Sequence, residues 1–274
     1  MSYCARVVLD SISPGGIRLT TIELTVPRFV LAEVNTHRAF SRNSASSRAI
    51  PTTKFIDRAM KNPVVPLEWG ANQKGMSATE LLPSEIAAEA TAEWLAARDD
   101  AVRHASNLLK LNVHKQIANR LLEPFMWHTM VITATDWANF FAQRLNGAQP
   151  ELMKGARLTF DTLAESVPKP IRGGEWHLPF IQPDEKHLPL PDRQKISVAR
   201  CARTSYLTHY GIRDLHEDYR LFDFLQTQGH WSPFEHQAYP LVRMGFSGNF
   251  FGWCQFRKLF ASENVLRLPV MDAV

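Results

Sequence analysis

Apolar and polar residues alternate near the beginning of the chain. Between Thr21 and Val26 every second residue is aliphatic, which is the period of two expected of a half-buried strand. The run Pro14-Gly15-Gly16 before it supplies the backbone freedom of a tight turn, and Val7 to Leu9 is a short apolar run on the other side of that turn. These features predict a β-hairpin.

A helix is expected directly after the hairpin. Pro27 suits a first helical turn, because its missing N–H would have no partner there. Phe29, Val30 and Val34 have the spacing of a buried stripe on such a helix. The helix would then bring His37 and the residues after it toward its end.

Farther along, the spacing of apolar residues predicts more helices and one more strand. Helices are expected at about 83–113, 114–127, 135–144, 196–203, 219–228 and 250–260, and a strand at 237–244. Residues 41–53, rich in Ser, Asn and Arg, are expected to form a loop, and the prolines of residues 167–192 predict a linker or insertion. Because helices and strands mix without a βαβ rhythm, we expect one α+β domain over residues 1–274, with a mixed or antiparallel sheet and several long helices.

Composition and charge narrow the class of protein only moderately. The chain is 45% hydrophobic and 21% charged, and it lacks both an apolar run of the roughly 18 residues that span a membrane and a secretory signal. We therefore expect a soluble, cytoplasmic protein whose three cysteines stay reduced. The net charge of +4 would attract anionic partners, but nucleotides, folate tails and nucleic acid all satisfy that condition.

The densest group of polar residues runs from Thr36 to Arg48. Its arginines and hydroxyls, with one histidine, can cradle a phosphate or a carbonyl edge; a solvated loop without a ligand has the same composition. The spacing resembles the signature of flavin-dependent thymidylate synthases, an Arg-His-Arg followed by Ser, Asn-Glu, Ser and Arg. The matching positions are His37, Arg38, Ser41, Asn43, Ser46 and Arg48.

Two later parts of the chain resemble the same family. Arg120 before Pro124 is similar to its nucleotide-binding arginine, and Asn139 and Arg144 are similar to its flavin-contacting asparagine and the arginine that faces the uracil ring. Residues 199–206 and 229–236 resemble its flavin-binding pieces, with matches at Ser205, His230, Ser232 and Glu235. His230, Glu235 and His236 also suggest a metal site, but no further ligand at a suitable spacing supports one.

The resemblance has an unusual order and three departures. In the family the Ser-Pro-Phe-Glu-His block precedes the Arg-His-Arg block, so this chain is either circularly permuted or partly duplicated, with a faint second copy around Phe256 to Asn264. Thr36, Ser44 and Glu33 stand where the family has arginine, glutamate and glutamine. We consider the hypothesis that Arg257, in the faint copy, replaces the charge missing at Thr36.

The resemblance implies reductive methylation of dUMP to dTMP, with FAD as cofactor and NADPH and 5,10-methylenetetrahydrofolate as co-substrates. It implies catalysis by Arg144 and sites formed between the subunits of a homotetramer. Nucleotide-binding residues would be Glu33, Ser44, Ser46, Ser47, Arg48, Arg120 and Arg144. Flavin-binding residues would be His37, Arg38, Ala39, Asn43, Asn139, Ser205, His230, Ser232 and Glu235. The alternatives are one-carbon transfer with a different product, such as a 5-hydroxymethyl pyrimidine nucleotide, and a non-catalytic protein that binds nucleotides or nucleic acid.

Overall fold

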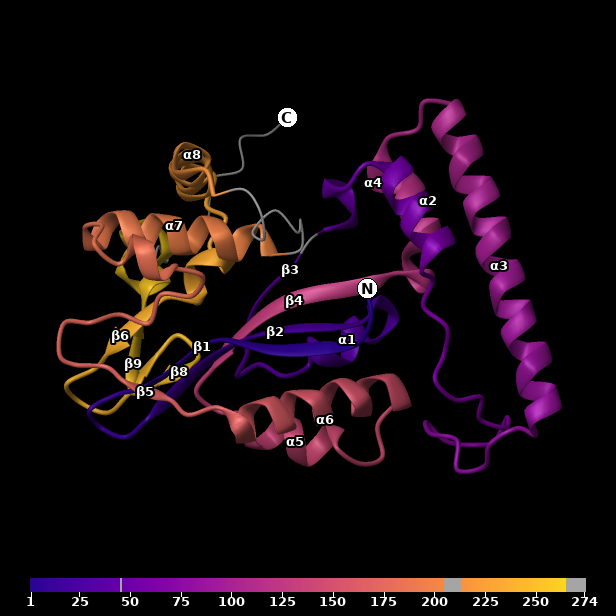
Figure 1. The fold of residues 1–274 in the computed structure, drawn as a ribbon, viewed down its shortest axis with the longest axis horizontal. Coiled ribbons are helices and arrows are strands. Elements are labelled where there is room, and N and C mark those ends of the chain that lie inside the picture. The colour runs from indigo at the N-terminus through magenta and orange to yellow at the C-terminus, as the bar shows by residue number, and fades with distance from the viewer. Residues whose placement is uncertain (45, 205–212, 265–274) are drawn as a thin grey trace, which may run out of the picture.

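A five-stranded sheet forms the centre of the computed structural model, which describes residues 1–44, 46–204 and 213–264 (Figure 1). The strand order is β3-β4-β2-β1-β5, and every pairing is antiparallel except that of β1 with β5. The strands are β1 (Cys4–Ile12), β2 (Arg18–Pro27), β3 (Ser41–Ser44), β4 (Trp127–Ala134) and β5 (Lys169–Pro170). Together with the helices around it, this mixed sheet confirms the predicted α+β class.

The predicted hairpin is present, but its second strand is more buried than expected. β1 and β2 pair from Cys4 with Thr25 to Ile12 with Arg18, and Gly16 takes a φ of +79° in the turn, a value that glycine adopts without strain. β2 is a central strand between β1 and β4, so both of its faces are covered. The prediction of a half-buried strand was therefore wrong.

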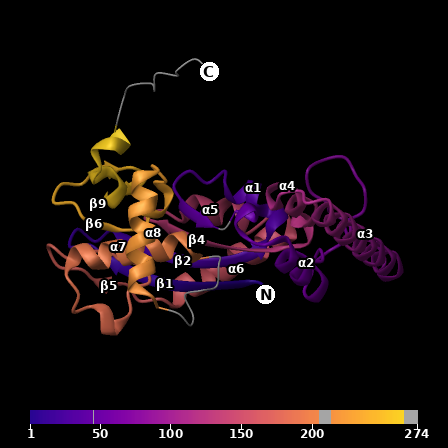
Figure 2. The same cartoon turned by 90° about the horizontal axis from the view of Figure 1, so that it is seen from above.

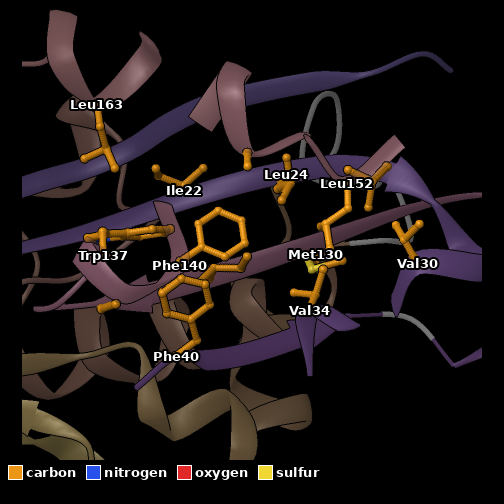
Figure 3. Close-up of a cluster of buried hydrophobic side chains, with 14 residues drawn as sticks. Ile22, Leu24, Val30, Val34, Phe40, Met130, Trp137, Phe140, Leu152 and Leu163 are labelled. Carbon is orange, nitrogen blue, oxygen red and sulfur yellow. The ribbon is translucent and has the colours of Figure 1, made fainter. Parts of the chain in front are cut away.

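One face of the sheet is apolar and is covered by α5 (Ala138–Arg144) and α6 (Pro150–Glu165). Figure 3 shows Ile22 and Leu24 of β2 and Met130 of β4 among the side chains of this cluster, with Phe140 of α5 and Leu152 of α6. A Cβ atom added at Gly155 of α6 would lie 2.6 Å from Val26 Cγ1. The absence of a side chain at this glycine lets α6 pack closely against β2.

The other face of the sheet is covered by the C-terminal part of the chain. Val131 of β4 packs with Phe180 and with Cys201 of α7 (Leu190–Ala202). Nearby lie α8 (Leu215–Thr227) and two small ladders, β6 (Ala238–Pro240) with β9 (Trp253–Gln255) and β7 (Phe246–Ser247) with β8 (Phe250–Phe251). This part of the molecule lies at the opposite end from α3 in both views (Figures 1 and 2).

A chain of buried hydrogen bonds crosses this second face. Ser11 Oγ contacts His177 Nδ1, His177 Nε2 contacts Thr21 Oγ1, Thr21 Oγ1 contacts Thr133 Oγ1, and Thr133 Oγ1 contacts His236 Nδ1, each at 2.8 Å. All five residues are almost fully buried. Burial lowers the pKa of His177 and of His236 to about 3, so both imidazoles are neutral at pH 7.

Three α-helices and a 3₁₀ helix form an arm beside the sheet (Figure 2). It consists of α2 (Thr52–Lys61), the long α3 (Ser84–Lys110), α4 (Lys115–Ala118) and the 3₁₀ helix Asn119–Phe125. A separate apolar cluster that includes Phe55, Ala105 and Leu122 joins them. The predicted helix at 83–113 is confirmed, and no helix of the described residues is long and apolar enough to cross a membrane.

Several predicted elements were wrong. Residues 41–44 form strand β3 because β4 supplies its hydrogen-bonding partner, although their sequence lacks alternation. Residues 114–127 contain only one α-helical turn, followed by a 3₁₀ helix that includes Pro124. Residues 250–260 form β8, β9 and a 3₁₀ helix, and the strand predicted at 237–244 ends at Pro240.

The proline-rich segment at 167–192 is mostly irregular and lies against the C-terminal part of the chain. His177 bridges to Ala238, and Glu185 forms a buried ion pair with Arg200 of α7 at 2.6 Å. Arg200 also pairs with Asp218 of α8 at 3.2 Å. The last residues of the proline-rich segment, from Leu190, belong to α7. Pro191 lies in the first turn of this helix and is tolerated there.

Candidate functional site

The segment after α1 (Leu31–Val34) is in contact with α5. Arg144, the last residue of α5, donates from Nε to His37 Nε2 at 2.9 Å and from Nη2 to Thr36 Oγ1 at 3.1 Å. Thr36 Oγ1 in turn donates to the carbonyl of Glu33 at 2.6 Å. The expected proximity of the His37 segment to Arg144 is therefore present within one chain.

His37 is a buried hydrogen-bond acceptor for Arg144. Its side chain is 7% exposed, and its ring meets that of Phe140 edge to face at 5.0 Å. Burial lowers the pKa of His37, and the charges of Arg144 and Arg42 lower it further, while a hydrogen bond with Asn139 acts in the opposite direction. A neutral imidazole can accept the Nε–H of Arg144 and so fix the plane of the guanidinium.

The middle of the motif, at Asn43, contacts the turn around Pro233. Asn43 of β3 donates from Nδ2 to the carbonyl of Cys201 at 2.8 Å and accepts from Ser232 Oγ at 3.1 Å. Asn43 thereby joins three segments that are far apart in the sequence. The expected proximity of Asn43 and Ser232 is also present, although Asn43 uses part of its hydrogen-bonding capacity to hold the protein together.

A second set of amide and hydroxyl groups holds the same region in place. Gln255 Nε2 donates to Ser41 Oγ at 3.0 Å and to Asn249 Oδ1 at 2.9 Å, and Asn249 Nδ2 donates to the carbonyl of Ala39 at 3.0 Å. Gly248 has a φ of +63°, and a Cβ atom there would lie 2.3 Å from Gln255 Oε1. Asn249 and Gln255 were not predicted from the sequence, because each acts on residues more than 200 positions away.

Two adjoining hollows lie beside α1, and both contain arginine side chains. We call the hollow of about 510 Å³ hollow A; Thr36, Arg38, Arg42 and Ser44 supply its polar lining. We call the hollow of about 480 Å³ hollow B; Arg28, Arg120 and Glu123 supply its charged lining. Leu31, Ala32 and Asn35 line both hollows. Both volumes lie in the range of about 300–1,000 Å³ that is usual for small-molecule sites.

Arg42 anchors the wall of hollow A. Its Nη1 donates to the carbonyls of Val34 at 3.1 Å and His37 at 2.9 Å. Burial and the charge of Arg38 lower the pKa of Arg42, while Glu235 raises it. Two guanidinium groups thus share one hollow, an arrangement that favours an anion between them. The sequence already contained Arg42 within the motif, but its role was not predicted.

The end of the motif lies apart from both hollows within a single chain. Ser46 Oγ accepts from the backbone N–H of Arg48 at 3.3 Å and from its Nε at 3.4 Å. Ser47 is buried and its hydroxyl has no hydrogen-bond partner in the described part of the chain, while Asn119 Nδ2 donates to its carbonyl at 2.7 Å. None of these three motif residues lines hollow A or hollow B, so their predicted nucleotide contacts stay predictions.

The other predicted residues have mixed positions. Arg120 lines hollow B, where it pairs with Glu123 at 2.9 Å, and one buried carboxylate oxygen of Glu33 has no partner in the described part of the chain. His230 is exposed after α8, with its ring 6.1 Å from that of Phe224. Ser205 lies outside the described residues.

The contacts of Arg257 do not support the hypothesis that it replaces the charge missing at Thr36. Arg257 forms ion pairs with Glu235 and, at 2.7 Å, with Glu263. The guanidinium that reaches Thr36 belongs to Arg144. Arg257 is therefore neutralised by two carboxylates, and Arg144 is the cation next to the position where the family has its first arginine.

The donor set around hollow A suits a flavin dinucleotide. Arg38 and Arg42 could hold its pyrophosphate, because guanidinium groups bind phosphate oxygens through paired hydrogen bonds. Ser44 in the hollow offers a neutral donor and acceptor of the kind that the edge of an isoalloxazine ring requires, whereas Asn43 and Ser232 do not line the hollow and bond to each other.

The match of one family model agrees with the sequence resemblance. The family model of the thymidylate synthase complementing protein matches residues 16–169, and a search of curated proteins gives no match. Among solved structures, a UMP/dUMP methylase, PolB from Streptomyces cacaoi bound with 5-Br UMP, has a TM-score of 0.49 and 14% identity, over 60% of this chain and 89% of that one. The same enzyme bound with 5-Br dUMP has a TM-score of 0.44 and 17% identity, over 54% and 67%.

The family match covers the segments that hold Arg38, Arg120 and Arg144. The blocks at 199–206 and 229–236 lie beyond it. Circular permutation and partial duplication therefore both stay predictions.

Proposed function

Since this chain belongs to the thymidylate synthase complementing protein family, we propose that it is a nucleotide-methylating enzyme that converts dUMP to dTMP by flavin-dependent reductive methylation. The observation that supports this most directly is the fixed guanidinium of Arg144. Its Nε and Nη2 are held by His37 and Thr36, which leaves the other N–H groups of its fork for a ligand. Arg144 is then a preorganised donor beside hollow A.

Arg144 is proposed to polarise a carbonyl of the pyrimidine. Negative charge develops on the ring oxygen when the ring carbon beside it becomes a nucleophile, and a donor that is already oriented stabilises that charge without reorganising. Neutral His37 keeps the guanidinium in place. If His37 became protonated, it would lose its acceptor nitrogen and repel Arg144, so we expect turnover to fall at acidic pH.

The other arginines are proposed to bind the anionic groups of the ligands. Arg120 and the predicted residues Ser44, Ser46, Ser47 and Arg48 would hold the nucleotide phosphate, with Glu33 near the pyrimidine. Flavin would lie against His37, Arg38, Ala39, Asn43, Asn139, Ser205, His230, Ser232 and Glu235. Bound FAD supplies hydride chemistry, with NADPH as its reductant and methylenetetrahydrofolate as the carbon donor, and the protein supplies position and charge.

A homotetramer with sites between subunits belongs to the same proposal. The predicted phosphate ligand Arg48 lies away from both hollows within one chain, so a neighbouring subunit would be needed to bring it to a nucleotide. Large apolar side chains are exposed near the end of α3 and in α4, with Leu111 at 74% and Ile117 at 56%. Light scattering of the purified protein would test the oligomeric state.

Two other functions are considered, the first of them motivated by Thr36, Ser44 and Glu33, which depart from the family pattern. One is transfer of a one-carbon unit that ends as a 5-hydroxymethyl pyrimidine nucleotide. The other is binding of a nucleotide or nucleic acid without catalysis.

One experiment separates the three functions. Purified protein is incubated with FAD, dUMP, methylenetetrahydrofolate and NADPH, and the nucleotide is analysed by mass spectrometry. We expect a product heavier than dUMP by one CH₂ group, which requires the reductant. A gain of CH₂O would indicate the hydroxymethyl product, and unchanged dUMP from a protein that is colourless as purified would contradict enzymatic function.

A further inference from the structure

A cavity of about 460 Å³ lies at the far end of the sheet from α3. Its walls come from three places, namely β1 and β5, residues 171–181 of the proline-rich segment, and the stretch from Lys186 to Arg193 at the start of α7. The cavity shares no lining residue with hollow A or hollow B. It is therefore separate from the site proposed above.

The rim of the cavity is cationic. Lys169, Lys186 and Arg193 line it, and within residues 1–44, 46–204 and 213–264 none of the three forms an ion pair. Arg193 donates from Nε to the carbonyl of Leu188 at 3.0 Å, which fixes its guanidinium. Glu175 is the acidic lining residue, and one of its oxygens accepts the backbone N–H of Arg172 at 2.8 Å.

The start of α7 adds to this positive potential. Leu190 is the first residue of the helix and lines the cavity. The amino end of a helix carries a partial positive charge from its unpaired N–H groups. Three side-chain cations thus line a volume whose lining contains one carboxylate, and Asp192 in the first turn of α7 offsets part of the charge of the helix terminus. The cationic side chains should make the cavity select anions.

The interior of the cavity is apolar and contains one aromatic ring. Leu9, Leu178 and Ile181 line it together with Trp176. The Trp176 ring packs against Tyr239 at 4.8 Å and against Phe256 at 5.4 Å, measured between ring centroids. A supported indole beside aliphatic side chains is a suitable surface for a flat ring.

One buried hydroxyl group adds a hydrogen-bonding group to the lining of the cavity. Ser11 lines the cavity and is 2% exposed. Its Oγ is held by His177 Nδ1 at 2.8 Å, the first contact of the buried chain that crosses the sheet. The lining can therefore donate or accept one hydrogen bond from a ligand.

We propose that this cavity is a second ligand site, which binds a small organic anion with a flat ring and a carboxylate or phosphate group. The ring would lie on Trp176 among the aliphatic side chains. The anionic group would lie at the rim, between Lys186 and Arg193 and within reach of Lys169. This assignment is independent of the methylation reaction, because no residue of the cavity takes part in that site.

The test uses three probes with the same ring and the full-length protein. These are para-nitrobenzoate, para-nitrophenyl phosphate and the uncharged para-nitrobenzamide, each titrated by calorimetry and by quenching of tryptophan fluorescence. We expect the two anions to bind at least about tenfold more tightly than the amide. The tighter anion identifies the preferred charged group.

Variants locate the binding. The double variant Lys186→Gln/Arg193→Gln should bind the preferred anion at least about tenfold more weakly, while Lys186→Arg/Arg193→Lys should retain most of the affinity. Trp176→Phe should remove much of the quenching. Arg38→Gln, which alters hollow A, should leave binding of the probe unchanged.

Equal affinity for the amide and the anions would overturn the proposal. So would wild-type affinity in the Lys186→Gln/Arg193→Gln variant, or loss of binding in Arg38→Gln. These outcomes do not depend on turnover, so failure here is distinguishable from failure of the proposed methylation.

Discussion

The two faces of the central sheet are both buried, but they are stabilised in different ways. The face toward α5 and α6 is aliphatic and aromatic, with Ile22, Leu24 and Ile132 completely inaccessible to solvent. The face toward the C-terminal part carries Thr21 and Thr133 in a hydrogen-bonded chain. The first face depends on removal of apolar area from water, and the second on partners for polar groups.

This difference explains why the two faces were unequally predictable. Alternation of residues identifies which side chains share a face, and the aliphatic face was predicted from it. Alternation does not reveal that a polar face is covered. Threonine hydroxyls can be buried when they bind one another, as Thr21 does with Thr133 at 2.8 Å and Thr25 with Thr129 at 2.7 Å.

The largest expected effect is a loss of stability at acidic pH, caused by two buried histidines of the polar face. His177 and His236 have pKa values of about 3 in the folded protein and about 6.5 when unfolded. The unfolded state therefore binds more protons below pH 6.5, so stability is full above that pH and falls as the pH drops toward 3. Between pH 7 and 5 the two residues together should lower the free energy of unfolding by about 4 kcal/mol.

Urea unfolding at several pH values measures this effect. His236→Gln should reduce the slope of stability against pH by about 1 kcal/mol per pH unit, whereas His104→Gln, on the exposed side of α3, should not change it. An unchanged slope in His236→Gln would mean that this imidazole is not buried in the neutral form.

The next effect concerns the apolar face. Leu24→Ala removes a completely buried side chain next to α6 and should lower the free energy of unfolding by about 3 kcal/mol, the usual cost of lost contacts and a cavity. Chemical denaturation at pH 7 measures it. A cost below about 1 kcal/mol would show that the face repacks freely.

A smaller effect is expected from one hydroxyl of the polar face. Thr133→Val keeps the volume but leaves His236 Nδ1 without its partner and leaves Thr21 with His177 alone, which should cost about 2 kcal/mol. Denaturation of Thr133→Ser, which retains the hydroxyl, provides the matched control. If valine were as stable as serine here, the hydrogen-bonded chain would contribute nothing.

The smallest effect is expected when both partners of a pair are removed. Thr25→Val/Thr129→Val replaces two hydroxyls that bind each other, so no buried group loses its partner, and stability should change by less than about 1 kcal/mol. Each single variant should be less stable than the double variant. The opposite order would contradict the idea that pairing, rather than polarity itself, determines the cost.

Secondary-structure elements that depend on nearby residues were predicted correctly from the sequence. The hairpin and the helix at residues 84–110 follow from periodicity and turn residues. β3 could not be predicted, because its strand conformation depends on pairing with β4, almost 90 positions away. The helix expected at 250–260 fails for the same reason, since Trp253–Gln255 pairs with β6.

The candidate site was predictable in part through family resemblance. The contacts of His37 with Arg144 and of Asn43 with Ser232 join segments that the motif had singled out. The supports given by Gln255 and Asn249 were not predictable, because amides in a segment without a motif give no sign of what they bind. The pairing of Arg257 with Glu235 and Glu263 was likewise visible only in three dimensions.

The central claim is that a guanidinium fixed at the end of α5 acts on a pyrimidine nucleotide beside hollow A. Steady-state turnover of dUMP by Arg144→Gln tests it most directly, with Arg157→Gln, an exposed change on α6, as control. We expect turnover to fall by about 10² to 10³-fold in Arg144→Gln and to stay at the wild-type rate in the control. Wild-type turnover in Arg144→Gln would contradict the claim.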